Sequence, residues 1–360
     1  MMCKPNGGTL MFSERLKLAR RRSGLSLRAL SSVAGGIVSA QAIGKYERGE
    51  MMPSSTVMIA LAEALDVPVS YLLSPTRISL NSVEFRKPTS IKVRERTSVE
   101  AEVLDQVDRY LQVEEILGID TSRHDNPVGA PFPISSVEEV EVAAQRLRDA
   151  WNLGGGPIPD MPELLEERGI KVFRLDLPGS VDGLSCRVRQ ADGDDIPAVV
   201  YSTGTSLERE RFTIAHELGH MVMDIPSSLD KERTCQRFAG AFIAPAEELV
   251  RELGRHRHNF GFAELIEIKH MFGISAAALV MRMRDLRIIT DTTVTAIFDG
   301  IGSSWKTDEP VPLKEAESHS RFRRLCLRAL AENEISQSKA AELLRLKVSE
   351  IEKIMAGSNV

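Results

Sequence analysis

The sequence has 360 residues, of which 42% are hydrophobic and 27% charged, so two or three folded domains are expected and global disorder is excluded. Its 46 basic and 51 acidic residues give a net charge of -5, which argues against a protein that coats nucleic acid through bulk charge but leaves room for a local basic patch. The four cysteines lie far apart without a CxxC pair, which excludes a disulfide framework and indicates a reducing compartment. Because no stretch is apolar over the ~20 residues of a membrane helix, we expect a cytoplasmic protein without a membrane partner.

Residues 11–75 are expected to form an all-α domain of five short helices. Apolar side chains recur there at helical spacing, and the breaks between the runs contain Gly, Pro or Ser. Between Ser26 and Arg48 the pattern is a helix, a Gly-containing turn and a second helix opened by Ser39, which is the geometry of a helix-turn-helix motif. The alternative is a basic helical bundle that binds a protein partner.

The second helix of this motif is predicted to enter the major groove of double-stranded DNA. Side chains near its N-terminus would then meet base edges, so Gln41 is the leading candidate for reading a base, with Ser39 and Lys45 closer to phosphates. The basic side chains expected to contact the DNA backbone are Arg20, Arg21, Arg22 and Arg28.

Residues 76–130 are interpreted as a linker that contains a charged helix. From 76 to 97 apolar and polar residues alternate without a helical period, which fits an extended linker and a β pair equally well. A charged helix is predicted over 98–117, and the prolines and glycine that follow it mark a boundary near residue 130.

Residues 135–290 are predicted to form an α+β domain. Two helices precede three short strands, KVFRL, LSCRV and IPAVVYS, which are expected to pair as a small antiparallel sheet. Long helices follow over 207–223 and 229–244, and shorter ones continue to residue 285. The last segment, 319–356, is expected to be a helical C-terminal tail, to which no role is assigned.

The motif HELGH, inside the expected helix 207–223, is the strongest chemical signal. Residues four apart lie on one helix face, so His216 and His220 can each point a ring nitrogen at one Zn²⁺ ion. The alternative is a histidine pair on a solvated helix face. It is disfavoured by the apolar neighbours that place the helix against a core: Phe212, Ala215, Leu218 and Gly219.

A catalytic zinc site needs a third protein ligand and one open position. In the next helix Cys235 belongs to the buried stripe, and one turn earlier Glu232 places a carboxylate at the end of that apolar face. An unpaired charge is costly there, so Glu232 is the leading candidate for the third ligand. The rival candidates are Asp224, Asp230, His256 and His258, and the remaining alternative is that Glu232 is a plain surface residue.

Glu217 lies about 100° around the helix from His216 and cannot join the two histidines as an equivalent ligand. It is placed to take a proton from the attacking water and to pass it to a leaving amine, so it is the candidate catalytic residue of a peptide hydrolase. The strand over 198–202 could hold an extended substrate by edge pairing, or it could be plain core sheet.

The segments FSERLKLARRRSGLS, SAQAIGKYERGEMMPSS and ALAEALDVPVSYLL resemble the Xre/Cro-type helix-turn-helix family over residues 12–74. The resemblance implies a five-helix DNA-binding domain that often acts as a dimer, in which Arg20 pairs with Glu47. Two features depart from the family pattern. The turn AGGIVS is about one residue longer than usual, and Gly44 lies within the recognition helix.

Residues 135–290 resemble the ImmA/IrrE family of zinc metallopeptidases through GGGPIPDMPELLEERGIKVFRL, RFTIAHELGH and ERTCQRFAGAFIAP. The resemblance implies a zincin-like fold with His216, His220 and Glu232 as metal ligands and Glu217 as the base. Members of that family include proteases that cleave DNA-binding repressors, and antitoxin-like regulators.

The sequence therefore predicts a transcriptional regulator with a fused zinc-dependent endopeptidase that cleaves a partner repressor or its own chain. We expect it to bind a DNA operator as a homodimer. The alternative is a repressor whose metallopeptidase-like domain is a sensor, or an antitoxin-type module that binds a toxin, with little turnover.

Overall fold

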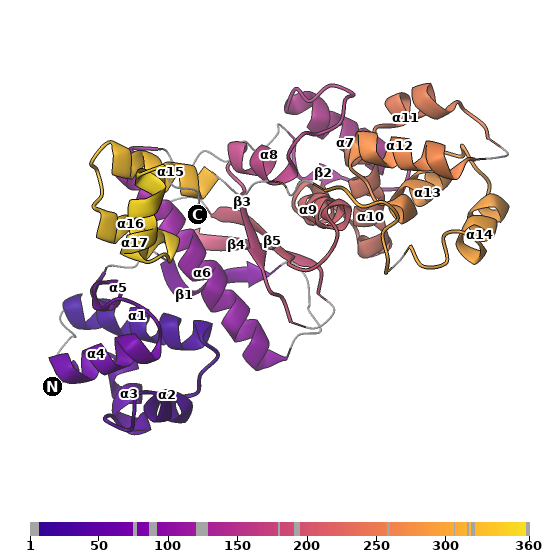
Figure 1. The fold of residues 1–360 in the computed structure, drawn as a ribbon. Coiled ribbons are helices and arrows are strands. Elements are labelled where there is room, and N and C mark those ends of the chain that lie inside the picture. Colours follow the sequence, from indigo (N-terminus) through magenta and orange to yellow (C-terminus); the bar gives the residue numbers. More distant parts are fainter. Residues whose placement is uncertain are drawn as a thin grey trace.

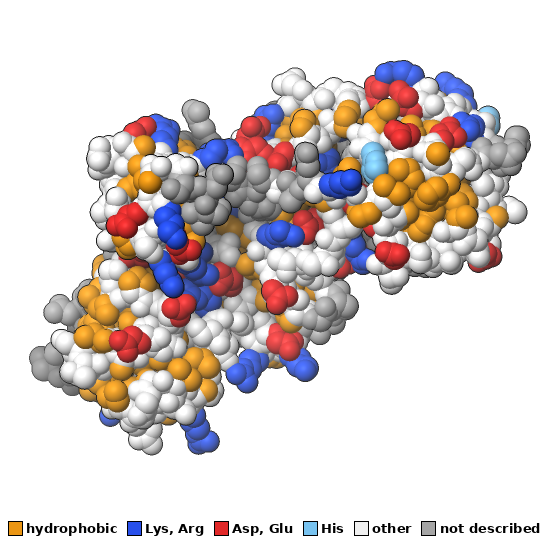
Figure 2. All heavy atoms as spheres, in the orientation of Figure 1, with side chains coloured by type: hydrophobic (Ala, Val, Ile, Leu, Met, Phe, Trp, Pro, Cys, Tyr) orange, Lys and Arg blue, Asp and Glu red, His pale blue; other side chains and the backbone are white. Residues whose placement is uncertain are grey.

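The computed structural model describes residues 7–74, 78–85, 92–119, 129–178, 181–190, 195–257, 260–305, 307–314, 317 and 321–357. Figure 1 shows the N-terminal helices at one end of the molecule and an α+β part at the other. The long helix α6 (Val93–Ile116) contacts the N-terminal helices, the C-terminal helices and the sheet. Figure 2 shows basic and acidic side chains gathered where the N- and C-terminal helices meet, and hydrophobic ones gathered over α12 and α13.

The N-terminal unit has the five helices that the sequence predicts. They are α1 (Gly7–Arg22), α2 (Leu27–Val33), α3 (Ala40–Glu47), α4 (Ser55–Ala64) and α5 (Val69–Leu73). Ser26, Ser39 and Ser54 cap α2, α3 and α4, each accepting a hydrogen bond from a backbone N–H in the first turn. Gly35 and Gly36 both have φ of +71° in the α2–α3 turn, a conformation that glycine adopts without strain.

The sheet of the α+β part contains β1 (Ile78–Phe85), β3 (Lys171–Leu175), β4 (Gly183–Gln190) and β5 (Ile196–Ser202) in the order β1-β4-β5-β3. β5 pairs antiparallel with β4 but parallel with β3, so the expectation of an antiparallel sheet is wrong and the sheet is mixed. The reason is that β5, buried from Ile196 to Tyr201, takes a partner on each edge. A strand hydrogen-bonded on both sides offers no edge to a substrate, so β5 is core sheet.

The segment between the N-terminal unit and residue 130 contributes to this α+β part. β1 pairs antiparallel with β4, so of the two interpretations of residues 76–97, a linker or a β pair, the described part fits the β pair. α6 covers one face of the sheet. Val103, Val107 and Leu111 of α6 pack with Ala198 and Val200 of β5. The opposite face of β5 packs against the helix that carries the HELGH motif. Although α6 is rich in charged residues, it covers the sheet because its apolar stripe faces the strands.

The other elements of the α+β part are helical apart from two short strands. β2 (Phe132–Pro133) pairs parallel with β6 (Met223–Asp224). The helices are α7 (Glu139–Ala150), α8 (Met161–Glu167), α9 (Leu207–Val222), α10 (Lys231–Ile243), α11 (Ala246–Leu253), α12 (Phe262–Phe272), α13 (Ala276–Asp285) and α14 (Asp291–Asp299). In the described part of the chain, no helix is both long enough and apolar enough to span a membrane.

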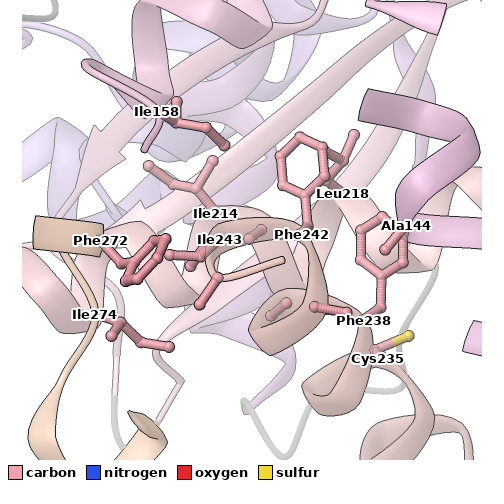
Figure 3. Close-up of a cluster of buried hydrophobic side chains, with 14 of the residues drawn as sticks. Ala144, Ile158, Ile214, Leu218, Cys235, Phe238, Phe242, Ile243, Phe272 and Ile274 are labelled. Carbon is pink, nitrogen blue, oxygen red and sulfur yellow. The ribbon is translucent and has the colours of Figure 1, made fainter. Parts of the chain in front are cut away.

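The packing of α9 against α10 forms the centre of the larger core (Figure 3), where Ile214 and Leu218 lie near Phe238 and Phe242. A Cβ atom at Gly219 would lie 2.9 Å from the ring of Phe238. Glycine at that position of HELGH therefore lets the two helices approach closely. This close approach determines which side chains of α10 face the histidines of α9.

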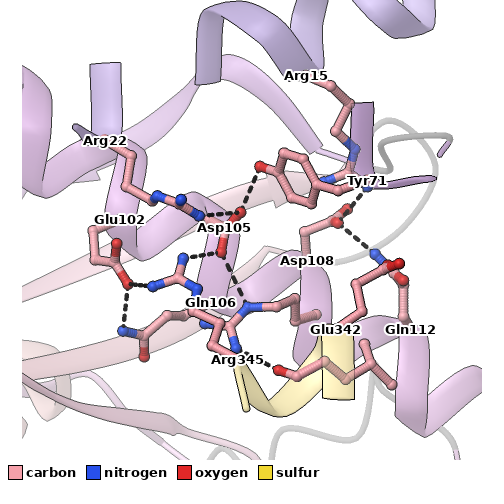
Figure 4. Close-up of polar contacts among 12 residues, drawn as sticks. Arg15, Arg22, Tyr71, Glu102, Asp105, Gln106, Asp108, Gln112, Glu342 and Arg345 are labelled. Atoms are coloured by element: carbon pink, nitrogen blue, oxygen red, sulfur yellow. Dashed lines mark hydrogen bonds and ion pairs between the residues drawn. The ribbon is translucent and has the colours of Figure 1, made fainter. Parts of the chain in front are cut away.

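The C-terminal module consists of α15 (Arg321–Ala331), α16 (Gln337–Leu344) and α17 (Val348–Met355), which pack on one another and on α6. A buried charged junction joins this module, α6 and the N-terminal unit (Figure 4). At its centre Asp105 of α6 accepts a hydrogen bond of 2.6 Å from the Tyr71 hydroxyl and forms ion pairs with Arg22, Arg109 and Arg345. One carboxylate thus contacts all three parts, and a second buried ion pair, Arg15 with Asp108, also joins α1 to α6.

Candidate metal centre and DNA interface

Helix α9 aligns the two histidines of HELGH. Its start is set by Ser206, whose side chain accepts a hydrogen bond from the Arg209 N–H. The Nε2 atoms of His216 and His220 lie 3.1 Å apart. His216 is only 8% exposed and His220 only 1%. The histidine pair therefore lies inside the protein with its ring nitrogens converging, and the alternative of a solvated surface pair does not apply.

Glu232 reaches both histidines from the first turn of α10. Its Oε2 atom lies 3.3 Å from His216 Nε2, and its Oε1 atom lies 3.4 Å from His220 Nε2. Asp230 fixes the start of α10 by accepting a hydrogen bond of 3.1 Å from the Arg233 N–H. The side chain of Glu232 is 42% exposed, so this corner of the group is open to solvent.

The spacing of these donor atoms fits a zinc ion. Two ligand atoms at the usual 2.0–2.1 Å from a tetrahedral zinc are separated by roughly 3.3 Å. The two histidine Nε2 atoms lie 3.1 Å apart, and each has a different carboxylate oxygen of Glu232 close by, at 3.3 and 3.4 Å. Two imidazoles and one carboxylate are also a donor set that catalytic zinc uses.

The rival ligands that the structure describes have other surroundings. Asp230 is used as the helix cap, and Asp224 lies on the short strand β6 with its residue exposed. His256 is exposed and its Nδ1 atom lies 3.3 Å from the Arg287 carbonyl oxygen. His258 lies outside the described residues.

Glu217 lies beside the two histidines and is only 1% exposed. One ligand atom each from His216, Glu217 and His220 lie within 4.8 Å of one another. A Cβ atom at Gly183 would lie 3.3 Å from Glu217 Cγ, so the start of β4 passes close to this carboxylate. Burial, with the nearby Glu217 charge, raises the pKa of the Cys186 thiol of β4 to about 12, so that thiol stays protonated and inert.

Cys235 supports the metal group in a way that sequence reasoning missed. Its Sγ atom lies 3.3 Å from Nδ1 of His220, the ring nitrogen that faces away from the converging donors. Such a partner fixes the orientation of a ligating imidazole. The available signal was that Cys235 lies one turn after Glu232 on the same face of α10.

The expected DNA-reading side chains share one surface of the N-terminal unit. Arg28 of α2 lies with Gln41 and Lys45 of α3 around a shallow cavity of about 420 Å³, and all three residues are exposed. Arg48, which sequence reasoning did not single out, lines the same cavity. Ser39 is exposed at the start of α3, where its hydroxyl accepts a hydrogen bond from the Ala42 N–H.

The arginines of α1 have different surroundings. Arg20 and Glu47 form a two-pronged ion pair with N–O distances of 2.5 and 2.8 Å, in agreement with the implied structural pair. Arg22 donates to the Leu65 carbonyl oxygen and lies 3.6 Å from Asp105, so its guanidinium joins the buried junction. Arg21 is half-buried.

The fold and the two surfaces define a DNA-binding protein with a metallopeptidase-like domain. Residues 16–72 match the family model described as helix-turn-helix, and residues 165–284 match that of the IrrE N-terminal-like domain, a peptidase family of the M78 type. No curated protein and no solved structure matches the chain significantly. The chain thus carries an Xre-type helix-turn-helix domain and an IrrE N-terminal-like domain.

Proposed function

We propose that the protein is a transcriptional regulator whose metallopeptidase domain is a zinc-dependent endopeptidase that cleaves a partner repressor or its own chain. The observation that carries this proposal is the group of three donors. Glu232 lies 3.3 and 3.4 Å from the two histidine nitrogens, and the buried Glu217 stands beside them. His216, His220 and Glu232 would hold the zinc ion.

The chain's own residues supply the proton transfers. When bound, zinc acts as a Lewis acid toward the substrate carbonyl and water. Glu217 takes one proton from the attacking water as the new C–O bond forms, and it returns that proton to the nitrogen as the C–N bond breaks. Cys235, 3.3 Å from His220 Nδ1, keeps that imidazole in the orientation that faces the metal.

The size of the cleft supports a polypeptide substrate. His216, Glu217 and Glu232 line a cleft of about 1590 Å³, whereas pockets for small molecules usually have about 300–1,000 Å³. An extended segment of several residues fits such a volume. This supports cleavage within a chain.

The N-terminal domain would hold the regulator on an operator in double-stranded DNA. We assign Gln41 to a base edge, and Ser39, Lys45, Arg21 and Arg28 to the neighbouring phosphates. A homodimer on a two-fold operator is the expected assembly. In this proposal the DNA-binding domain spans 11–75, the metallopeptidase domain spans 135–290, and the C-terminal module at 319–356 has no assigned role.

The test of the proposal is Glu217→Gln, which keeps the size of the side chain but removes the proton acceptor. This variant should keep its zinc and lose all cleavage of a proteome-derived peptide library and of its own chain. Glu210→Gln is the matched control, two turns earlier on α9 where Glu210 pairs with Arg174. Undiminished cleavage by Glu217→Gln contradicts the assignment of peptidase chemistry to this site.

A second candidate is favoured by the buried junction at Asp105, which ties the DNA-binding unit to α6 and the C-terminal module. In this candidate the metallopeptidase-like domain is a sensor or a toxin-binding antitoxin module, and α6 transmits its state to the DNA-binding unit. Glu217→Gln separates the two candidates, because a sensor that does not cleave would regulate its operator as well with Gln as with Glu.

A further inference from the structure

The cleft at the metal group has an apolar side that the proposed chemistry does not use. Phe212 lies one turn before His216 on the same face of α9, so it continues the histidine row away from the metal. The apolar lining continues with Ala278 and Met281 of α13, Val294 and Phe298 of α14, and Trp305 beyond them. Polar side chains of the same elements, among them Ser275, which caps α13, Arg282 of α13, and Thr307 and Glu309 beyond Trp305, line the rest of the cleft.

The side chains of this pocket are partly open to the cleft. Phe212, Ala278, Met281 and Phe298 are only half-buried although they pack on the main core. Figure 2 shows α13 within the surface region where hydrophobic side chains gather. An apolar concavity beside a few polar groups is the usual form of a binding pocket.

The walls of the pocket are held in place from outside. A Cβ atom at Gly302 would lie 3.0 Å from Trp305, so glycine allows the tight turn on which the indole rests. Beyond Trp305, Glu309 accepts a hydrogen bond of 2.9 Å from the Ala276 N–H at the start of α13 and pairs with Lys269. Lys269 is 0% exposed and also binds Glu208 of α9. The pocket is therefore preformed, and a ligand would not have to order it.

Part of the pocket lies beyond the segment that matches the family model. The match to the IrrE N-terminal-like domain ends at residue 284, and Val294, Phe298 and Trp305 lie beyond it. Ala277 and Ala278 of α13 line the same cleft as Met281 and Phe298. The lining thus contains small residues as well as large apolar ones, and a larger side chain at Ala278 would take up space in the cleft.

We infer that this pocket selects the substrate: it binds one bulky apolar side chain, such as Leu, Met or Phe, next to the bond that is cleaved. This inference rests on the proposed endopeptidase function. Since such side chains are buried in most folded proteins, the segment cleaved is one that its own protein leaves exposed or opens locally. The partner is therefore a protein with an exposed apolar segment.

The cleavage test uses the full-length zinc-loaded protein and a proteome-derived peptide library read by mass spectrometry. We expect Leu, Met or Phe to be enriched at one fixed position beside the cleaved bond. Ala278→Leu should fill the pocket and shift that position toward small residues by about tenfold or more in relative rate. Ala296→Leu, on the exposed face of α14, is the matched control and should leave the profile unchanged.

A binding test separates this inference from the proposed function. Zinc-loaded Glu217→Gln protein is titrated with decapeptides that differ only in a central Leu or Ala within a Gly-Ser background. The Leu peptide should bind about 10- to 100-fold more tightly, and Ala278→Leu in the same background should remove the difference. Equal binding, or a library profile without side-chain preference, overturns the pocket. If the zinc-loaded wild-type protein shows no Glu217-dependent cleavage while the binding difference is intact, only the endopeptidase function is overturned.

Discussion

The metal group and the Asp105 junction both bring polar side chains together, but Asp105 is fully buried whereas the Glu232 side chain is 42% exposed, and they balance charge differently. At Asp105 the positive charges come from the chain itself, as Arg22, Arg109 and Arg345. At Glu232 the neighbours are two imidazoles, which carry no charge when they act as ligands. A carboxylate surrounded by guanidinium groups holds structure, whereas one that converges with two imidazoles is suited to an external cation.

The largest expected effect comes from a substitution that disrupts the metal group and leaves the Asp105 junction intact. His220→Ala removes one of three converging donors, so it should abolish measurable zinc binding and all cleavage. Metal content by mass spectrometry and a peptide-cleavage assay measure both. Operator affinity should be unchanged, because the junction at Asp105 stays intact. Full zinc occupancy in both His216→Ala and His220→Ala would move the metal site elsewhere.

The second largest effect is expected from a substitution that disrupts the Asp105 junction and leaves the metal group intact. Asp105→Asn removes the buried negative charge that Arg109 and two further guanidinium groups share, which should lower the free energy of unfolding by about 3–5 kcal/mol. Urea denaturation measures this, with zinc content as the second readout, and zinc content should not change. The control is Glu332→Gln, which breaks an exposed pair with Arg328 and should have a much smaller effect. An equal loss in both variants would show that the junction is not special.

Acid should weaken the junction in a defined window. Burial alone would raise the pKa of Asp105, but Arg109, Arg345 and Arg22 outweigh it and lower the pKa from 3.8 to about 2. The ionised carboxylate therefore stabilises the folded state above about pH 4, and this contribution of about 2 kcal/mol is lost as the pH falls toward 2. Urea titrations across this window should give a flatter pH dependence for Asp105→Asn than for the wild type. Parallel curves would contradict the shift.

The smallest effects separate the DNA surface from the junction. Gln41→Ala should lower discrimination between operator and random DNA by ~1–3 kcal/mol, and Arg28→Ala should flatten the salt dependence by about one unit. Arg22→Ala should instead lower stability and leave the salt slope unchanged, because its guanidinium contacts Asp105 and Leu65. Binding over a salt series, beside denaturation curves, distinguishes these outcomes. A flatter salt dependence of DNA binding for Arg22→Ala would instead show that Arg22 contacts the DNA backbone.

Much of the metal group could be read from the sequence because it is made by two consecutive helices. The period of α9 places His216 and His220 on one face, and the apolar stripe of α10 ends at Glu232. Cys235 was read only as a core residue, since its contact with His220 depends on how closely α10 approaches α9. That approach is allowed by Gly219 and Phe238, two residues on different helices.

By itself the sequence determined the elements of this protein, because helix periods, caps and turns act over a few residues. The five N-terminal helices, three of them with serine caps, and the HELGH helix are of this kind. Only the tertiary structure decided the partners: β5 between β3 and β4, α6 on the sheet, and Asp105 between Arg22 and Arg345. A local pattern shows which face of an element is apolar. Which distant face covers it is settled only when the whole chain packs.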